Sequence, residues 1–510
     1  MRNTLYHRPH FRCCVFLLVL GSLVYGNHLQ NPFQFDTVAY IVNEHRLDNI
    51  NEQLNINYLL EDFFHRSLLQ ISIAFNAHLD GFRTFSYHLI NLLLHLINSL
   101  LVYFITCRMW CYFRSMDYQS TETEKRFVAL FTAILFLLHP IQTESVIYIM
   151  SRSEVFAGTF YLSAFLLFQV YLAKDRPIKT GFKVLVLFII SIAFILGFSV
   201  KQTVITLPLM LLLYFLFGQE PESSSIRWLN KWKWKIGFIV LVGIILLFYK
   251  LLTDESFLIG PSSAGEDIGR LNYMLTQPSV IVYYYVKLLV FPINLNIDPD
   301  ILLVTEWWSW KFITALTGIA GLIYFSCRAK EKLFLLYFIF WFLIVLSPSS
   351  SIITLGDLAA EHRTYLASYS FYAAVAFCVY KVSHLVYSAH PKKSRNIALA
   401  VSIFISVIFS VLTIQRNKIW ASEVSLWADT LKKSPQKIRP VINLAQAYTK
   451  VGTFDLAVEY YEKALILNPN IFATNYNLAN LYLEKGREED GLRLLQTAAL
   501  IRPKTPEVHG

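Results

Sequence analysis

The stretch Phe33-Gln34-Phe35-Asp36-Thr37-Val38-Ala39-Tyr40 follows closely on the first long apolar run of the chain. It places one carboxylate, Asp36, between aromatic side chains just past the end of that run. In the chain as a whole, 55% of the 510 residues are hydrophobic and only 16% are charged. This composition excludes an ordinary water-soluble globular protein. We therefore expect Asp36 to lie at the mouth of a helical bundle in a membrane.

Apolar runs suited to cross a bilayer, which takes about 20 residues each, recur from residue 13 to residue 415 and then stop. The sequence predicts an all-α polytopic membrane domain over 1–415, with about 11 spanning helices. We expect 13–26 to be an uncleaved first helix, and the doubtful run 277–292, which carries three tyrosines and Lys287, to be re-entrant or interfacial. The predicted spans are 13–26, 86–106, 127–138, 154–173, 184–199, 203–217, 236–252, 310–327, 332–347, 364–386 and 396–414.

Basic residues are distributed unevenly between the two sides of this bundle. With the N-terminus in the cytoplasm, 22 Lys and Arg fall on the inner side, ten on the outer side and 13 in the tail. Cytoplasmic loops carry the excess of Lys and Arg in membrane proteins. Eleven crossings therefore put the first loop, 27–85, and the C-terminal tail outside. The net charge of +10 reflects this excess of basic residues in cytoplasmic loops. We therefore expect no binding of nucleic acid.

The tail repeats itself with a period of 34 residues. Asn443-Leu-Ala-Gln-Ala-Tyr448 aligns without gaps with Asn477-Leu-Ala-Asn-Leu-Tyr482. This period, with small residues where helices must approach closely, predicts two tetratricopeptide repeats over 438–510 and a degenerate capping repeat over 416–437. Further matched positions are Gly452 and Gly486, Ala457 and Gly491, Ala464 and Ala498, and Pro469 and Pro503.

Ionisable residues at membrane depth are costly, so each one is a candidate site residue. The span 86–106 carries His88, Asn91, His95 and Asn98 on one helix face. This face cannot point at lipid. Its residues bond to neighbouring helices, or His88, at the outer end, contacts a ligand.

Two further polar groups lie near the outer ends of spans. Glu144, Tyr148 and Arg152 share a helix face, and they form a surface ion network or, with His139, line a binding site. Lys201 stands in a tight turn between two apolar runs. Its side chain extends to the interface, or it binds an anion such as a lipid phosphate.

The segment 347–368 is rich in serine and carries Glu361, His362 and Arg363 where the next span begins. An arginine fork suits a phosphodiester, because two parallel hydrogen bonds can form. The alternative is a structural pair between Arg363 and Asp357.

Three acids remain to be assigned. Asp298 and Asp300 follow the doubtful run, and they could help to hold a divalent cation such as Mg²⁺ or Mn²⁺, or simply form a turn. Asp36 acts as a base, or it caps the helix that follows it.

Several of these motifs together resemble the transmembrane and tetratricopeptide-repeat (TMTC-like) proteins, which are C-type (GT-C) glycosyltransferases related to protein O-mannosyltransferases. The resemblance covers nearly the whole chain. The chain departs from the family pattern at Thr37, where a second acid is usual, and at Gln202, where an acid usually follows the lysine. The motifs are Phe35-Asp36, Ser86-Tyr87-His88-Leu-Ile-Asn91, His139-Pro140-x-Gln-Thr-Glu144-x-Val, Pro292-x-Asn-Leu-Asn-Ile-Asp298, Pro348-Ser-Ser and Glu361-His362-Arg363-x-Tyr365-Leu.

The resemblance implies a GT-C-like bundle and a polyprenyl- or dolichyl-phosphate sugar donor, with mannose the sugar in metazoan members. It also implies that Asp36 is the general base toward a Ser or Thr hydroxyl of an exported protein. The expected phosphate-binding residues are Lys201, Arg363, Arg152 and His362. The expected pocket residues are His88, His139, Glu144, Lys287, Asp298 and Glu361.

The implied location is a bacterial inner membrane with a periplasmic tail, or the endoplasmic reticulum with a lumenal tail. We expect the repeats to hold the acceptor or a partner protein. Two other classes of function stay open. One is a non-catalytic membrane scaffold that presents the repeats, and the other is a transporter, although no related halves are visible in the sequence.

Overall fold

The computed structural model describes residues 2–37, 66–114, 122–172, 180–217, 268–351 and 354–503. The described secondary-structure elements are helical. The chain divides into two compact units. The membrane unit comprises Met1–Leu295 and Leu302–Lys418, and the repeat unit comprises Asn296–Ile301 and Ile419–Gly510.

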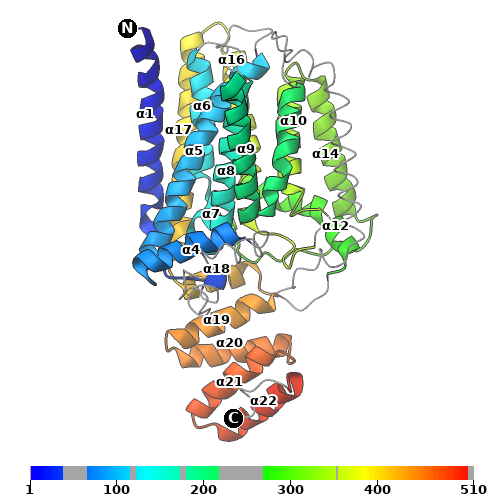
Figure 1. Cartoon of the computed structure of the whole chain (residues 1–510). Helices are drawn as coiled ribbons and strands as arrows, with labels where there is room; N and C mark the ends of the chain where they lie inside the picture. The colour runs from blue at the N-terminus through cyan, green and yellow to red at the C-terminus, as the bar shows by residue number, and fades with distance from the viewer. Residues whose placement is uncertain are drawn as a thin grey trace. The chain divides into compact units, whose positions relative to one another are not determined.

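The long helices of the membrane unit run side by side as a bundle (Figure 1). Its α-helices are α1 (Arg2–Tyr25), α4 (Ser67–Asp80), α5 (Thr84–Arg114), α6 (Glu122–Leu138), α7 (Thr143–Ile147), α8 (Arg152–Tyr171), α9 (Thr180–Val200), α10 (Leu207–Phe217), α12 (Arg270–Ser279), α13 (Lys287–Val290), α14 (Trp310–Arg328), α15 (Lys332–Leu346), α16 (Ser368–Val386) and α17 (Pro391–Ile419). Short 3₁₀ turns are η1 (Gly26–His28), η4 (Pro140–Gln142), η5 (Ile149–Ser151), η6 (Gln202–Thr206) and η9 (Glu361–Thr364), and η8 (Val280–Val286) is a π-helix.

The predicted count of about 11 spans is not confirmed. Six helices of the described residues are long and apolar enough to cross a membrane, and a seventh arises if α6 and the turn after it form one span bent by 50°. The apolar helices at Gln202–Phe217 and Lys332–Leu346 are shorter than the required length. The predicted span 236–252 lies outside the described residues. The six spans are Pro9–His28, Thr84–Trp110, Ile149–Tyr171, Gly181–Val200, Trp310–Arg328 and Pro391–Ile419.

The polar face of α5 is buried in the bundle and bonds to the elements around it. Asn91 donates to the carbonyl of Val146 at 3.2 Å, and Asn98 donates to the carbonyl of Val155 at 2.7 Å. His95 lies 2.8 Å from the hydroxyl of Tyr365. Buried polar groups need such partners. Asn91, His95 and Asn98 therefore bond to neighbouring elements of the bundle, which is the first of the two interpretations offered for this helix face.

The repeat unit consists of two helix pairs and a preceding helix. Each pair is joined by a turn with glycine in the left-handed region, Gly452 at φ 76° and Gly486 at φ 72°. The next residue in each turn, Thr453 or Arg487, donates to a carbonyl five residues back, which closes the helix end. The helices are α18 (Glu423–Lys433), α19 (Ile438–Lys450), α20 (Phe454–Leu467), α21 (Phe472–Glu484) and α22 (Glu488–Ile501).

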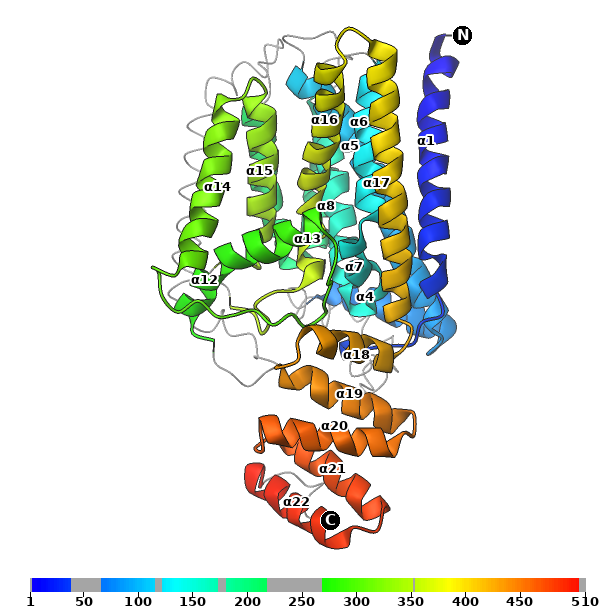
Figure 2. The ribbon, with the colours of Figure 1, turned by 180° about the vertical axis from the view of Figure 1, so that it is seen from behind.

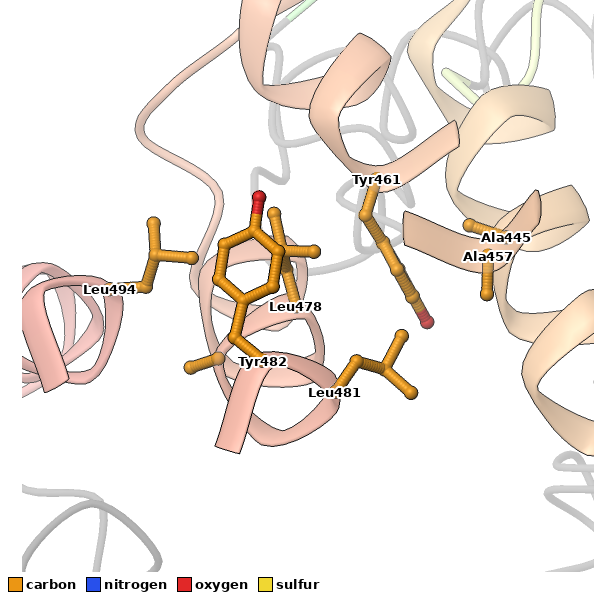
Figure 3. Close-up of a cluster of buried hydrophobic side chains, with 8 residues drawn as sticks. Ala445, Ala457, Tyr461, Leu478, Leu481, Tyr482 and Leu494 are labelled. Carbon is orange, nitrogen blue, oxygen red and sulfur yellow. The ribbon is translucent and has the colours of Figure 1, made fainter. Parts of the chain in front are cut away.

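A single buried cluster holds the two pairs together. Leu478 and Tyr482 of α21 lie between Tyr461 of α20 and Leu494 of α22 (Figure 3). Close approach is needed at Gly491, where a Cβ atom would lie 2.8 Å from the side chain of Leu483. Gly491, one of the small residues of the 34-residue pattern, thus lies where α21 and α22 pack closely.

Candidate functional site

The candidate site lies at the end of the membrane unit opposite the N-terminus of α1, where α4, α7 and α12 gather (Figure 1). The helices α12 and α13 lie at this end rather than alongside the full length of the bundle (Figure 2). Polar side chains from α7, α8, α12, η8 and η9 and from the turn before η6 meet here. We call this group the polar cluster, and its members are Glu144, Glu154, Lys201, Tyr273, Tyr284, Glu361, His362 and Arg363.

Glu144 and His362 form a largely buried contact of the polar cluster. Glu144 lies in the short helix α7. The helix α6 ends just before His139-Pro140, and α7 begins after the turn η4. Its Oε1 atom lies 2.6 Å from Nδ1 of His362, and the Glu144 side chain is only 3% exposed. Residues 218 positions apart in the sequence thus share a hydrogen bond.

Lys201 forms an ion pair with Glu154 of the first turn of α8. The β-conformation at Lys201 separates α9 from η6 and turns the ammonium group into the membrane unit, where its side chain is 14% exposed. Burial lowers the pKa of Lys201, and the charge of Glu154 opposes that shift. The amine therefore keeps its charge best while an anion lies beside it.

Arg363 bonds to neutral oxygens. Its Nη2 donates to the backbone carbonyl of Asp357 at 2.9 Å, and Nη1 lies 3.4 Å from the hydroxyl of Tyr273. Arg363 and Lys201 are close enough to interact electrostatically. Two cations therefore belong to one site. Lys201 is already paired with Glu154, and a bound anion would be a further partner for these two cations.

The π-helix η8 presents two successive tyrosines to η9. Tyr284 donates to Oε1 of Glu361 at 3.2 Å, and the hydroxyl of Tyr285 accepts from the amide of Ala360 at 3.2 Å. A π-helix turns less per residue than an α-helix, so consecutive side chains can face the same neighbour. Such segments are frequent at functional sites.

Asp36 is exposed, and it lies at the start of a helical turn at the border of the described residues. Phe35 before it adopts a left-handed backbone conformation with φ 55°, which is uncommon for an aromatic residue. The ring of Phe35 lies 5.7 Å from that of Tyr148, one turn beyond Glu144. The residue before Asp36 thus contacts the residue that ends α7.

Arg152 is fully buried and bonds to neutral acceptors. It donates to Asn91 Oδ1 at 2.7 Å, to Asn76 Oδ1 at 2.7 Å and to the carbonyl of Ser72 at 2.9 Å. A further bond reaches the carbonyl of Tyr87 at 3.0 Å. These bonds fasten α4 and α5 to the start of α8. This geometry gives Arg152 a structural role, and its predicted contact with phosphate stays a prediction.

The remaining expected pocket residues have different surroundings. Both ring nitrogens of His139 are engaged, one near the carbonyl of Leu289 at 3.1 Å and one with the amide of Ile141. His88 is buried 3.0 Å from the carbonyl of Asn31. Lys287 is exposed at the start of α13.

Asp298 belongs to the repeat unit and not to the polar cluster. It forms ion pairs with Lys437 and with Arg439, the latter at 2.6 Å, and its side chain is 2% exposed. Both carboxylate oxygens are thus engaged by cations, which does not suit a metal ligand. In the described ranges, no three His, Cys, Asp or Glu side chains are placed to hold a metal ion.

Sequence reasoning missed Glu154 as the partner of Lys201 and Tyr273 as the partner of Arg363. The signal for Glu154 was its place in the first turn after Arg152, where an acid beside a helix N-terminus is easily read as a cap. Tyr273 stands before the apolar run, so hydropathy gave it no weight.

Comparison with known proteins agrees with this organisation. A family model for the tetratricopeptide repeat matches residues 448–510. Protein O-mannosyl-transferase F38B6.6 of Caenorhabditis elegans is 25% identical and aligns with 90% of this chain and 63% of its own length. Protein O-mannosyl-transferase TMTC1 of Homo sapiens is 24% identical over 90% of this chain and 56% of its own length.

Protein O-mannosyl-transferase TMTC3 of Mus musculus is 23% identical over 95% of this chain and 54% of its own length. The chain therefore spans between about half and two thirds of the curated relatives that it matches. The alignments cover the membrane unit and the repeats together. The chain is thus similar, over 90% or more of its length, to animal proteins that are named protein O-mannosyl-transferases.

Proposed function

We propose that this chain transfers a sugar, mannose, from a polyprenyl or dolichyl phosphate to Ser or Thr hydroxyls of exported proteins. The observation that carries the proposal is the similarity to protein O-mannosyl-transferases along 90% of the chain. The polar cluster supports it, because Lys201 and Arg363 place two cations in one site at the end of a membrane bundle. A lipid-linked phosphate is an anion held at such an interface.

The chemistry requires three groups. Asp36 takes the proton from the acceptor hydroxyl, whose oxygen then bonds to the anomeric carbon of the sugar. The bond from that carbon to the phosphate oxygen breaks, and the electron pair stays on the phosphate. The configuration at the anomeric carbon is inverted in this single displacement. Lys201 and Arg363 stabilise the negative charge that the leaving phosphate gains.

Other residues position these groups. Arg152 holds α4 and α5 against α8, and Glu361 with Tyr284 fixes η9 beside η8. Asp36 is exposed, as a base that meets an incoming protein must be. We place the repeats on the same side as Asp36, where they would hold the acceptor. The similarity to animal proteins supports the endoplasmic reticulum over a bacterial membrane.

Glycan analysis of exported proteins tests this proposal. Cells with and without the chain are compared for O-linked mannose on Ser and Thr, with Lys201→Met as a variant that keeps the length of the side chain but removes the cation. We expect mannose-bearing peptides that disappear with the chain and with Lys201→Met. Identical glycans in all three cultures would contradict the transferase and favour a scaffold that presents the repeats.

A further inference from the structure

A third cation, Arg66, lies beside the two cations of the polar cluster. Arg66 is the residue before α4, and α4 packs against α9. Lys201 follows the end of α9, and the charges of Arg66 and Lys201 are close enough to repel each other. Arg363 interacts with Lys201 in the same way. Positive charges from three separate parts of the chain thus gather at one end of the membrane unit.

The backbone holds Arg66 in an unusual conformation. Its φ is 67° and its ψ is 32°, in the left-handed region that residues with a Cβ atom rarely adopt. The carbonyl of Arg66 accepts from the amide of Gln70 at 3.1 Å, and the next residue, Ser67, is buried. Arg152 fastens α4 further along its length. Strained residues persist where the surrounding structure holds them, and they cluster at functional sites.

Arg66 differs from the other two cations in its partners. Lys201 forms an ion pair with Glu154. Arg363 donates to the carbonyl of Asp357. The Arg66 side chain is exposed, and among the described residues it forms no ion pair and no hydrogen bond. Its charge is therefore the one of the three that is most available to an anion arriving from outside the chain.

The two lipids of the proposed reaction differ in charge. The phosphate of the sugar-bearing donor is a diester and carries a single negative charge. Once the bond to the sugar is broken, the phosphate is a monoester, which carries about 1.5 to 2 negative charges near neutral pH. Electrostatic attraction grows in proportion to charge, so a cation beside the phosphate attracts the monoester more strongly than the diester.

We propose that Arg66 is a third binding residue for the lipid phosphate, and that it favours the polyprenyl phosphate product over the sugar-bearing donor. Its guanidinium group pairs with the charge that the phosphate gains when the sugar leaves. This inference rests on the proposed function and identifies the ligand that the site holds more tightly. Arg66 thereby opposes the exchange of product for a new donor.

Three variants isolate the charge of Arg66. Arg66→Gln removes the charge and keeps a polar side chain, whereas Arg66→Lys keeps the charge and removes the fork. Both replacements carry a Cβ atom, so the backbone conformation is strained to the same degree as in the parent. Arg83→Gln, at an exposed arginine just past the other end of α4, is the matched control. The 14 residues of α4 separate the two arginines by about 20 Å.

Binding is measured near neutral pH on the full chain in lipid nanodiscs, with polyprenyl phosphate and with polyprenyl phosphate mannose as probes. We expect Arg66→Gln to bind polyprenyl phosphate roughly fivefold more weakly, as for the loss of one exposed charge pair. The mannose lipid, with about half the charge, should bind roughly twofold more weakly. Arg66→Lys should stay near the parent for both lipids because it keeps the charge, and Arg83→Gln should match the parent.

Other outcomes overturn the inference. Equal weakening for the two lipids would remove the preference for the product, and unchanged affinity for both would remove Arg66 from the phosphate site. Unchanged lipid affinities with a raised KM for a Ser/Thr peptide would assign Arg66 to the acceptor. In each of these cases the parent still binds both lipids, so the proposed function stands. A parent chain that binds neither lipid overturns the proposed function, and the inference falls with it.

Discussion

Asp36 and Thr37 are neighbours in the chain with opposite surroundings. Asp36 is exposed, whereas Thr37 is 1% exposed, and its hydroxyl has no hydrogen-bond partner among the described residues. A second acid at position 37 would place an ionised carboxylate in a buried position, which is costly without a paired cation. Of positions 36 and 37, the chain thus carries its acid at the accessible one.

Arg363 offers the clearest test of phosphate binding at a single residue. Arg363→Lys replaces a fork by a point charge, and Arg363→Ala removes the charge. We expect the alanine variant to lose about 2 kcal/mol of affinity for polyprenyl phosphate, or roughly 30-fold, and the lysine variant to lose less. Equal affinity of all three proteins in a lipid-binding assay would leave Arg363 only its bonds to Asp357 and Tyr273.

At the scale of elements, long-range bonds hold the site together more than local propensity does. The short helix α7 has five residues and is too short to be stable alone. It is kept in place by the contact of Glu144 with η9 and by the bond from Asn91 to Val146. The helix α4 depends in the same way on Arg152.

We predict that Arg152→Lys loosens α4 without removing phosphate binding. Lysine keeps the charge but offers three donors in place of the fork, so acceptors on Ser72 and Asn76 lose their bonds, at about 1–3 kcal/mol each. Amide hydrogen exchange should therefore speed up in α4 while affinity for polyprenyl phosphate changes little. A large loss of affinity with unchanged exchange in α4 would instead make Arg152 a ligand of the phosphate.

The ion pairs of Asp298 in the repeat unit depend on pH. Burial alone would raise the pKa of Asp298, but the hydrogen bond and charge of Arg439, with Lys437, hold this pKa below its usual value. The stability from these pairs is therefore fully present above about pH 4, the usual pKa of an aspartate, and is lost as the pH falls through the lower folded pKa.

Amide hydrogen exchange between pH 7 and pH 3 tests the contribution of these ion pairs, with intrinsic exchange rates corrected for pH. Protection of Asn296–Ile301 should drop below about pH 4 in the parent. Asp298→Asn should lower it already at pH 7, by about 1–3 kcal/mol, and abolish the pH dependence. Asp455→Asn, which breaks an exposed pair with Lys485, is the control and should change little. A pH-independent parent would contradict the assignment.

At the scale of the whole molecule, the local patterns of the sequence predicted much of what the structure shows. The 34-residue period predicted both helix pairs of the tail, because small residues recur in the sequence where paired helices must approach closely. Hydropathy located the long spans, but the count of about 11 stays unconfirmed, since α10 and α15 are short and α6 breaks at His139-Pro140. The pairing of Lys201 with Glu154 and the place of Asp298 in the repeat unit depend on distant contacts that local patterns do not contain.

The predicted orientation gives a whole-molecule test. A reporter that is active only outside the cytoplasm should be active when fused after Gly510, because the basic residues place the tail outside. The same reporter inserted after His390, between α16 and α17, should be silent. Activity at His390 and silence at Gly510 would invert the topology and put the proposed site on the wrong side of the membrane.

The central claim is that this chain catalyses sugar transfer with Asp36 as its base. The most direct measurement is mannose transfer from polyprenyl phosphate mannose to a Ser/Thr peptide by the purified chain, compared with Asp36→Asn and Glu44→Gln. Asparagine keeps the size and the capping ability of Asp36, so the variant should fold. We predict that its transfer rate falls roughly 10²–10⁴-fold while Glu44→Gln stays near the parent. Parental rates in Asp36→Asn with loss in Glu44→Gln would assign the base to the other carboxylate, and a parent that transfers no mannose would contradict the claim itself.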